Sequence, residues 1–385
     1  MALTFNRLIH AENGGLEWSQ SANAQVSNVA TQVGSGVRSF LLDATSTAIA
    51  DFNAFNVRAD AGSKTCIAFW FNSDRAINGP IAYWHDNSTT SFTLQYYASN
   101  KQLALLDSVP AIVILSAANA IQPSTDYLIR LYIDRVNSGD AELFIDDVSV
   151  GTVTGKDFLN VTGTEVFRYL HTTESGKVSN FGPGFIATGL TGVADCPVGL
   201  GIAAYRSTLA SATPDSGTDL DTGTWANMQE IPPNQANDGL YTGSGTQSGY
   251  VLTNDAGGGA GTGGPNTDTD IGSDTVIAVE GWWRMKRSGG STTDHFGELG
   301  NSVDGVTQSV DFNPGTALAD YWMISESASV VPTKSEYGAI GFTKTGGNQV
   351  LGVSDMLLTV LYTTPDVTPA IIYNPAQRYA PFLVR

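Results

Sequence analysis

Four consecutive residues, Trp84-His85-Asp86-Asn87, place an aromatic ring beside three polar side chains. Carbohydrate sites combine these features, because a sugar stacks on an aromatic ring while its hydroxyls hydrogen-bond to polar neighbours. Tyr83 precedes Trp84, and since side chains alternate across a strand, one of two adjacent aromatic residues faces outward. We therefore predict a carbohydrate-binding site with an exposed Trp84 ring, formed by Trp84, His85, Asp86 and Asn87. Packing of Trp84 in a core is the alternative.

Acidic residues occur in four pairs that could do chemistry: Asp140 with Glu142, Asp146 with Asp147, Asp219 with Asp221, and Asp268 with Asp270. Glycoside-cleaving β-sandwiches use two carboxylates on neighbouring strand positions. All four pairs lie instead in predicted turns or linkers, where carboxylates favour chain reversal and keep strand edges soluble. We therefore predict no catalytic residue and no enzymatic activity. Clustered aspartates also suit a hard cation, so calcium is the one cofactor left open.

Other reactive side chains follow no catalytic or metal-binding pattern. The sequence contains no HExxH, Gly-x-Ser-x-Gly or phosphate-loop motif, and its four histidines are dispersed. The glycine-rich run 257–264 has no following lysine and is predicted to be a surface loop. Cys66 and Cys196 are the only cysteines. We expect two free, partly buried thiols in a chain made in a reducing cytosol, with a single disulfide as the alternative.

The stretch 124–155, STDYLIRLYIDRVNSGDAELFIDDVSVGTVTG, predicts three consecutive strands. Apolar residues occupy every second position from Tyr127 to Ile133, which is the period of a strand. Turn-forming residues at 137–140 and the pair Asp146-Asp147 separate this strand from two further alternating stretches. The pattern indicates an antiparallel meander with one buried face and one solvent face, as in a sandwich rather than a parallel sheet.

The whole chain has the composition of an all-β protein. It has 385 residues, of which 42 are glycine and only 15% are charged, and Ser, Thr and Asn recur between short apolar stretches. The second half carries Trp282-Trp283, which should point to opposite faces of one strand, one ring into a core and the other outward. We predict four parts: a sandwich of two large sheets over 1–205, a linker over 206–224, a second, smaller β-sandwich over 225–362, and an extended arm over 363–385.

The arm contains four prolines among apolar residues, so it cannot join a central strand easily. It leaves apolar side chains that would be poorly buried alone: Ile371, Ile372, Tyr373, Phe382 and Leu383. We predict that the arm and the apolar faces of the second sandwich attach the chain to a particle or to identical copies, in a homo-oligomer.

Charge and hydropathy exclude two classes of partner. The net charge is −18 and the acidic residues are dispersed, so no basic surface for nucleic acid is expected. The longest apolar run, 110–118, is too short to cross a bilayer, and residues 1–10 contain no apolar signal-peptide core. We therefore expect neither membrane insertion nor export by a recognisable signal.

The stretches KTCIAFWFN at 64–72 and YLIRLYIDRVNSGDAELFIDDVSVGTVTG at 127–155 resemble the laminin G/concanavalin A-like jelly roll. In that family an x-L-Y-I-D-G strand is followed by a V-G-x strand, and this chain departs from it by having Asp147 in place of the turn glycine. The resemblance implies an all-β jelly-roll sandwich over residues 1–205. It implies no single function, since such sandwiches serve as lectins, glycosidases and structural modules.

The segment 198–244 is similar to one that recurs in virion proteins of tailed bacteriophages. The matching residues are Leu200, Gly201, Trp225, Glu230, Pro232, Pro233, Asp238 and Tyr241. The resemblance implies a virion structural protein, assembled in the cytoplasm of a bacterial host, that serves as a decoration, fibre, or tail or collar appendage. Its implied partners are capsid or tail subunits and a host-surface glycan. The alternatives are a jelly-roll glycan depolymerase or glycosidase, and a soluble carbohydrate-binding protein.

Overall fold

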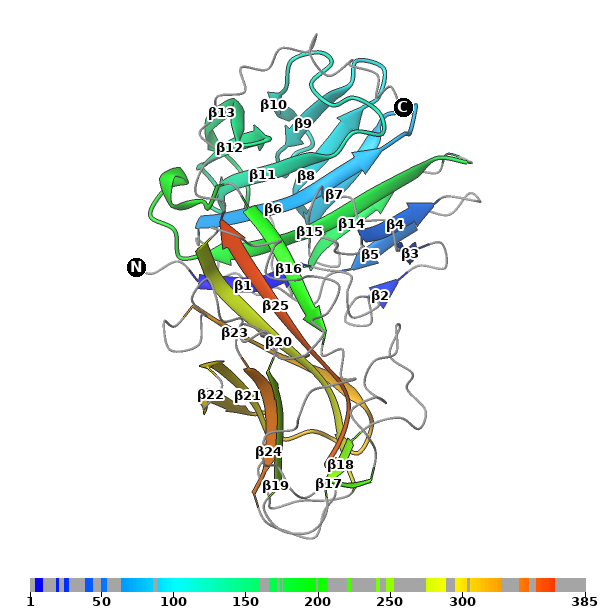
Figure 1. Cartoon of the computed structure of the whole chain (residues 1–385). Helices are drawn as coiled ribbons and strands as arrows, with labels where there is room; N and C mark the ends of the chain where they lie inside the picture. The colour runs from blue at the N-terminus through cyan, green and yellow to red at the C-terminus, as the bar shows by residue number, and fades with distance from the viewer. Residues whose placement is uncertain are drawn as a thin grey trace, which may run out of the picture.

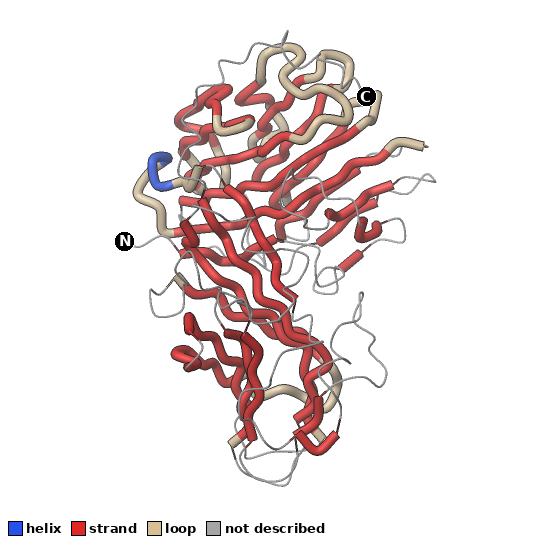
Figure 2. Tube along the Cα trace, in the orientation of Figure 1, coloured by secondary structure: helices blue, strands red, loops and turns tan. Residues whose placement is uncertain are grey.

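The described part of the protein is built almost entirely from antiparallel strands (Figure 1, Figure 2). Within the described residues the helical structure is one 3-10 turn, η1 (Val193–Asp195). This confirms the prediction of an all-β fold. The structure, a computed structural model, describes residues 4–9, 19–20, 24–27, 39–43, 50–53, 64–85, 89–159, 166–171, 174, 176–198, 200–206, 220–222, 240–242, 247–252, 275–288, 295–302, 305–326, 339–345 and 351–363.

Two large sheets form the N-terminal sandwich, which is the predicted concanavalin A-like jelly roll. Sheet A consists, in the order of neighbouring strands, of β13 (Val148–Lys156), β12 (Gly139–Ile145), β11 (Tyr127–Asp134), β6 (Lys64–Ser73), β15 (Val178–Thr188), β4 (Ser39–Asp43) and β3 (Ala24–Ser27), with β1 (Thr4–Ile9) beside β15. Sheet B consists of β10 (Ile112–Leu115), β9 (Gln102–Leu106), β8 (Thr90–Tyr97), β7 (Gly79–His85), β14 (Val166–His171), β5 (Ala50–Asn53) and β2 (Ser19–Gln20).

The facing sides of sheets A and B enclose the first hydrophobic core. Every second residue of β6 and of β11 points into it, as the period of the sequence predicts. Aromatic rings from both sheets meet at its centre, where Tyr169 and Phe181 stack with their ring centroids 4.4 Å apart. Fully buried residues of this core include Phe69, Phe71, Ile129, Leu131, Trp84, Phe92 and Phe167.

The predicted meander is confirmed as β11, β12 and β13, which pair in sequence order. Ile145 pairs directly with Val148, so Asp146 and Asp147 form the whole turn between β12 and β13. Their φ angles are 49° and 62°, the left-handed pair that a primed hairpin turn needs. Asp147 therefore takes the place of the family's glycine without loss of the tight turn.

Two smaller sheets form the C-terminal part. Sheet C consists of β17 (Leu220–Thr222), β18 (Leu240–Thr242), β25 (Leu351–Thr363), β20 (Thr275–Arg287) and β23 (Ala319–Ser325), with β16 (Leu200–Arg206) beside β25. Sheet D consists of β19 (Gln247–Leu252), β24 (Ala339–Lys344), β21 (His295–Ser302) and β22 (Gly305–Asp311). Sheets C and D pack together around Trp283, whose Nε1 donates to the Gly341 carbonyl at 2.7 Å.

The pairing of β16 places the boundary between the two parts earlier in the sequence than we predicted. It pairs with β25 along its whole length, from Leu200 opposite Thr363 to Arg206 opposite Leu357. Residues 200–205, which we assigned to the jelly roll, therefore belong to sheet C. The predicted linker 206–224 also contains one strand, β17, and its remaining residues after Arg206 lie outside the described residues.

Sheet C has no solvent face around β20, because it lies between sheet A and sheet D (Figure 1). On the side toward sheet A, Ala278 and Leu361 join a second hydrophobic core with Leu128, Tyr132 and Phe185. Two expectations are therefore wrong. Trp282 and Trp283 are both fully buried, and β11 is buried on both faces instead of exposing one.

The contact between β1 and sheet C contains a buried ion pair. Arg7 Nη1 lies 3.2 Å from Glu280 Oε2, with both side chains almost fully buried. The same carboxylate oxygen accepts the Leu8 backbone N–H at 3.1 Å, and the Arg7 guanidinium lies over the Trp322 ring, 4.3 Å from its centroid. Charge and apolar contact thus join the two parts into one packed body rather than two modules on a tether.

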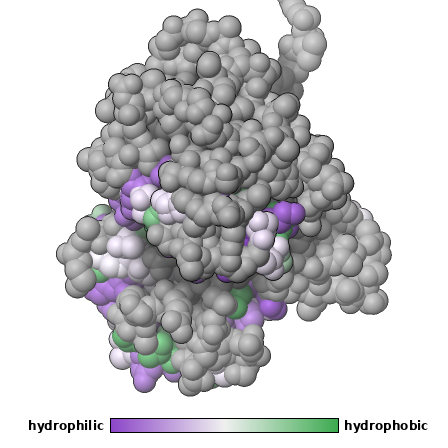
Figure 3. Space-filling model, turned by 90° about the horizontal axis from the view of Figure 1, so that it is seen from below, coloured by the Kyte–Doolittle hydropathy of each residue, from purple (hydrophilic) through white to green (hydrophobic). Residues whose placement is uncertain are grey.

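The predicted arm lies outside the described residues beyond Thr363, and so do Ile371, Ile372, Tyr373, Phe382 and Leu383. In the view from the end formed by sheets C and D, the described side chains show small hydrophobic patches beside hydrophilic ones (Figure 3). The apolar faces of sheet C that we expected to attach the chain to a particle are occupied within the chain itself.

Candidate functional site

Trp84 lies inside the jelly roll, so the expected exposure of its ring is wrong. The ring is fully buried, with the centroids of Phe92 and Phe167 at 6.0 and 6.1 Å. The buried Arg135 guanidinium lies 4.5 Å from its centroid. Trp84 is therefore a core residue that no sugar can stack on. Of its predicted partners, Asp86 and Asn87 lie outside the described residues.

The neighbouring side chains Tyr83 and His85 point the other way, to the outer face of sheet B. Tyr83 is half-buried, and its ring centroid lies 4.6 Å from that of His85 in an edge-on contact. Arg168 stands opposite Tyr83 on β14, and its Nη1 donates to the Tyr83 hydroxyl at 2.7 Å. These three residues bring a phenol, an imidazole and a guanidinium to one surface.

Strand β8 extends this surface on the other side of β7. Thr93 lies directly opposite Tyr83, so the two side chains share a face. Gln95 and Tyr97 follow at every second position, while the alternating Leu94 and Tyr96 point into the core. We call this set the outer-face cluster: Tyr83, His85, Thr93, Gln95, Tyr97 and Arg168. His85 is buried, and the other members are partly buried.

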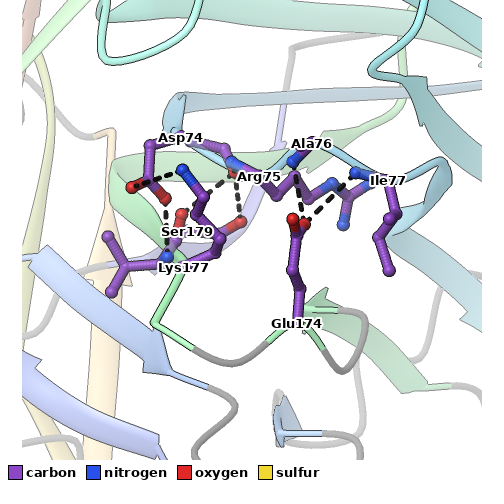
Figure 4. Close-up of polar contacts among 9 residues, drawn as sticks. Asp74, Arg75, Ala76, Ile77, Glu174, Lys177 and Ser179 are labelled. Carbon is purple, nitrogen blue, oxygen red and sulfur yellow. Dashed lines mark hydrogen bonds and ion pairs between the residues drawn. The ribbon is translucent and has the colours of Figure 1, made fainter.

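Polar contacts hold the connections next to β7 and β14 in place (Figure 4). The Glu174 carboxylate accepts the backbone N–H groups of Ala76 and Ile77 at 2.8 and 3.2 Å. Asp74 accepts the Val178 N–H at 2.7 Å and lies 3.7 Å from Lys177. These contacts tie the segment that enters β7 to the segment that leaves β14. The strands that carry Tyr83 and Arg168 are thereby fixed relative to each other.

A serine and a histidine also meet in this region, but inside the sandwich. His171 Nδ1 lies 2.8 Å from Ser179 Oγ, which lies 2.8 Å from Ser73 Oγ. Such a contact resembles a nucleophile and its base, yet His171 and Ser179 are both fully buried. The three residues join β14, β15 and β6, and we assign them a structural role.

The acidic pair Asp146-Asp147 also has a structural role. Asp146 Oδ1 accepts the Leu128 N–H at 2.9 Å, and Asp147 Oδ1 lies 2.9 Å from Arg130 Nε. Both carboxylates thus fasten the β12–β13 turn to β11. Within the described residues, no group of three or more His, Cys, Asp or Glu side chains is arranged to hold a metal ion. In the same part of the chain, no helix has the length and apolar character needed to span a membrane.

Sequence reasoning assigned Trp84 to the wrong face of β7. The dipeptide Tyr83-Trp84 was sufficient to show that one ring faces outward, but its larger member fills the core. Arg168 was missed, although FRYLH places it between Phe167 and Tyr169, two core aromatics at every second position. A charged residue at that position must face away from the core, which is the signal that could have identified it.

No model of a known protein family matches the sequence, and no curated protein matches it either. Among solved structures, the chain is similar to a carbohydrate esterase from the Shiga toxin-encoding bacteriophage phi24B, with 13% identity over 49% of this chain and 99% of that chain (TM-score 0.37). An endo-β-1,4-glucuronan lyase from the fungus Trichoderma reesei matches with 13% identity over 49% of this chain and 94% of that one (TM-score 0.37). The globular domain of T. cruzi calreticulin matches with 12% identity over 50% of this chain and 91% of that one (TM-score 0.36). The likeness concerns the fold, and we transfer no residue's role from it.

Proposed function

We propose that this chain is a structural component of a bacteriophage virion, a decoration, fibre, or tail or collar appendage, that binds a host-surface glycan without cleaving it. The outer-face cluster carries the glycan part of the proposal. The virion part rests on the sequence resemblance of segment 198–244, and the homo-oligomer rests on the apolar residues of the arm. Capsid or tail subunits are the proposed partners.

The outer-face cluster has the chemistry of a sugar-binding surface. The Tyr83 and Tyr97 side chains supply aromatic surface, while Thr93, Gln95 and Arg168 supply hydrogen-bond donors and acceptors. Sheet C covers part of the outer face of sheet A, so within the described residues sheet B offers the broader open face of the jelly roll. A ligand that lies along this face crosses β14, β7 and β8.

The binding test uses the whole purified chain on an array of bacterial capsular and lipopolysaccharide glycans. We expect Tyr83→Ala and Arg168→Ala each to lower the affinity for the bound glycan about tenfold, equivalent to about 1.4 kcal/mol. Thr152→Ala, at an exposed position on β13, is the matched control and should bind like the wild type. Equal binding by all three variants would contradict the assignment of the cluster.

Glycan cleavage is the second candidate, because the Tyr83 hydroxyl and the His85 imidazole are groups that can transfer protons. The same experiment separates the two functions when the bound glycan is recovered and sized by chromatography. Intact glycan supports binding alone. Glycan shortened by the wild type and not by Tyr83→Phe would replace our proposal with a depolymerase.

The virion assignment is tested on particles purified from a lysed host. We expect peptides of this chain in the mass spectrum of the particles, and density for the jelly roll on their surface in cryo-electron microscopy. If no particle contains the chain, the virion part fails, and a glycan-binding result from the array would then favour a soluble carbohydrate-binding protein.

A further inference from the structure

The two cysteines, which lie far apart in the sequence, meet on the outer side of sheet A. Cys66 belongs to β6, and Cys196 follows η1 in the segment that leads from the jelly roll to sheet C. Both side chains are free, buried thiols in the same second hydrophobic core, and Cys196 is near enough to raise the pKa of the Cys66 thiol. The prediction of two free, partly buried thiols describes their state, but it did not place them in the same core.

The segment 189–198, which we call the crossover, is held in place before any covalent bond forms. Lys64 Nζ donates to the Thr191 carbonyl at 2.7 Å, which fastens the crossover to the start of β6. Asp195 Oδ2 accepts the Thr191 N–H and hydroxyl, both at 2.6 Å, and the Cys196 N–H donates to the Val193 carbonyl at 3.0 Å. The loop is therefore ordered with Cys196 already against β6.

We infer that Cys66 and Cys196 are the two halves of an oxidisable cross-link that locks the crossover, and through it sheet C, onto sheet A. The crossover is the direct covalent path from β15 to β16. A disulfide at this point would close a long loop and join both parts of the molecule, the arrangement in which a cross-link restricts the unfolded chain most. The reduced form suits the cytosol, and the oxidised form suits the space outside the cell.

The reaction is a pair of thiol–disulfide exchanges with a small disulfide such as oxidised glutathione. A cysteine thiolate attacks one glutathione sulfur, and a glutathione thiolate leaves; the second cysteine thiolate then attacks the mixed disulfide and releases the other glutathione. The two cysteine protons end on the two glutathione thiols, and the protein sulfurs together lose two electrons. Burial, and then the neighbouring Cys196, raise the pKa of the Cys66 thiol, so Cys66 stays protonated and unreactive until the crossover opens.

The test treats the whole chain with oxidised glutathione, once in the native state and once during refolding from urea. Remaining thiols are alkylated in denaturant, and non-reduced peptides are identified by mass spectrometry. We expect a peptide pair joined through Cys66 and Cys196, together with an upward shift in Tm that dithiothreitol reverses. The joined pair under either condition supports the inference. If both thiols are alkylated, or carry only glutathione, under both conditions, the inference is overturned.

Single variants supply the control. Cys66→Ser and Cys196→Ser each lack one partner, so glutathione should give at most a mixed disulfide and no reversible rise in Tm. The wild-type peptide measurement does not depend on whether either variant folds. A reversible rise in Tm in a single variant would show that the shift has another cause.

Discussion

At the scale of single residues, Trp84 shows how burial decides between two roles for one side chain. Its ring packs against Phe92 and Phe167 from one side of the core and beneath the Arg135 guanidinium from another. A truncation there removes ring contacts from three neighbours and leaves a cavity that a close-packed interior fills only in part. Such a change should therefore lower the stability of the fold, and any loss of binding would follow from that.

We predict that Trp84→Ala lowers the free energy of unfolding by about 3–5 kcal/mol, the usual range for a large aromatic residue lost from a core. Urea unfolding, monitored by far-ultraviolet circular dichroism instead of tryptophan fluorescence, measures this change. Tyr83→Phe, one residue away on the outer face, is the control and should change stability by less than about 1 kcal/mol. An unchanged unfolding midpoint for Trp84→Ala would mean that the ring is not a core residue.

At the scale of elements, the turn Asp146-Asp147 combines backbone geometry with side-chain contact. Both residues have a positive φ, which aspartate tolerates better than most side chains. Each carboxylate also reaches β11, Asp146 at the Leu128 N–H and Asp147 at Arg130. A glycine at position 147 would suit the backbone but would leave the almost fully buried Arg130 without this carboxylate.

We predict that Asp147→Ala destabilises the protein more than Asp147→Gly, by about 1–2 kcal/mol, the cost of a left-handed conformation for a residue with a Cβ. Both variants lose the contact to Arg130, so the difference between their stabilities measures the cost of the left-handed backbone conformation alone. The free energies of unfolding in urea give that difference. Equal stability of the two variants would contradict the primed geometry of the turn.

The strands could be predicted from sequence far better than their surroundings. The alternation of apolar and polar residues predicted β6, β11, β12 and β20, and the turn residues predicted the meander. What lies over the second face of a strand is not a local property. Leu128 and Tyr132 lie in the row of β11 that we predicted to face solvent, and they mark the face that sheet C covers. The outer-face cluster likewise depends on pairing between β7 and β14, which are far apart in the chain.

At the scale of the whole molecule, the ion pair between Arg7 and Glu280 joins the first described strand to the centre of sheet C. Glu280 is fully buried and also accepts the Leu8 N–H, so its loss would leave a guanidinium and a backbone donor without this carboxylate. Removing one partner of a buried ion pair lowers the stability by more than the intact pair contributes to it, because the remaining charge stays buried without its counter-charge. The ion pair should therefore stabilise the jelly roll and sheet C together.

We predict that Glu280→Ala lowers the free energy of unfolding by about 3–5 kcal/mol and reduces amide protection from hydrogen exchange in β1, β15 and β20 alike. The matched control is Lys177→Ala, which removes a pair whose lysine is 38% exposed and should cost less than about 1 kcal/mol. If protection falls only in sheet C, the two parts are held together less tightly than the buried pair indicates.

The place of β25 in sheet C has a consequence for the making of the protein on the ribosome. It lies between β20 and β18, beside β16, and it is the last described strand to be synthesised. The apolar outer face of sheet A, with Leu128 and Phe185, leaves the ribosome more than a hundred residues earlier. At roughly 5–20 residues per second, that face waits for its cover on the order of ten to thirty seconds. During that interval the nascent chain exposes an apolar surface that is not yet covered, so its yield should depend on translation speed and on chaperones.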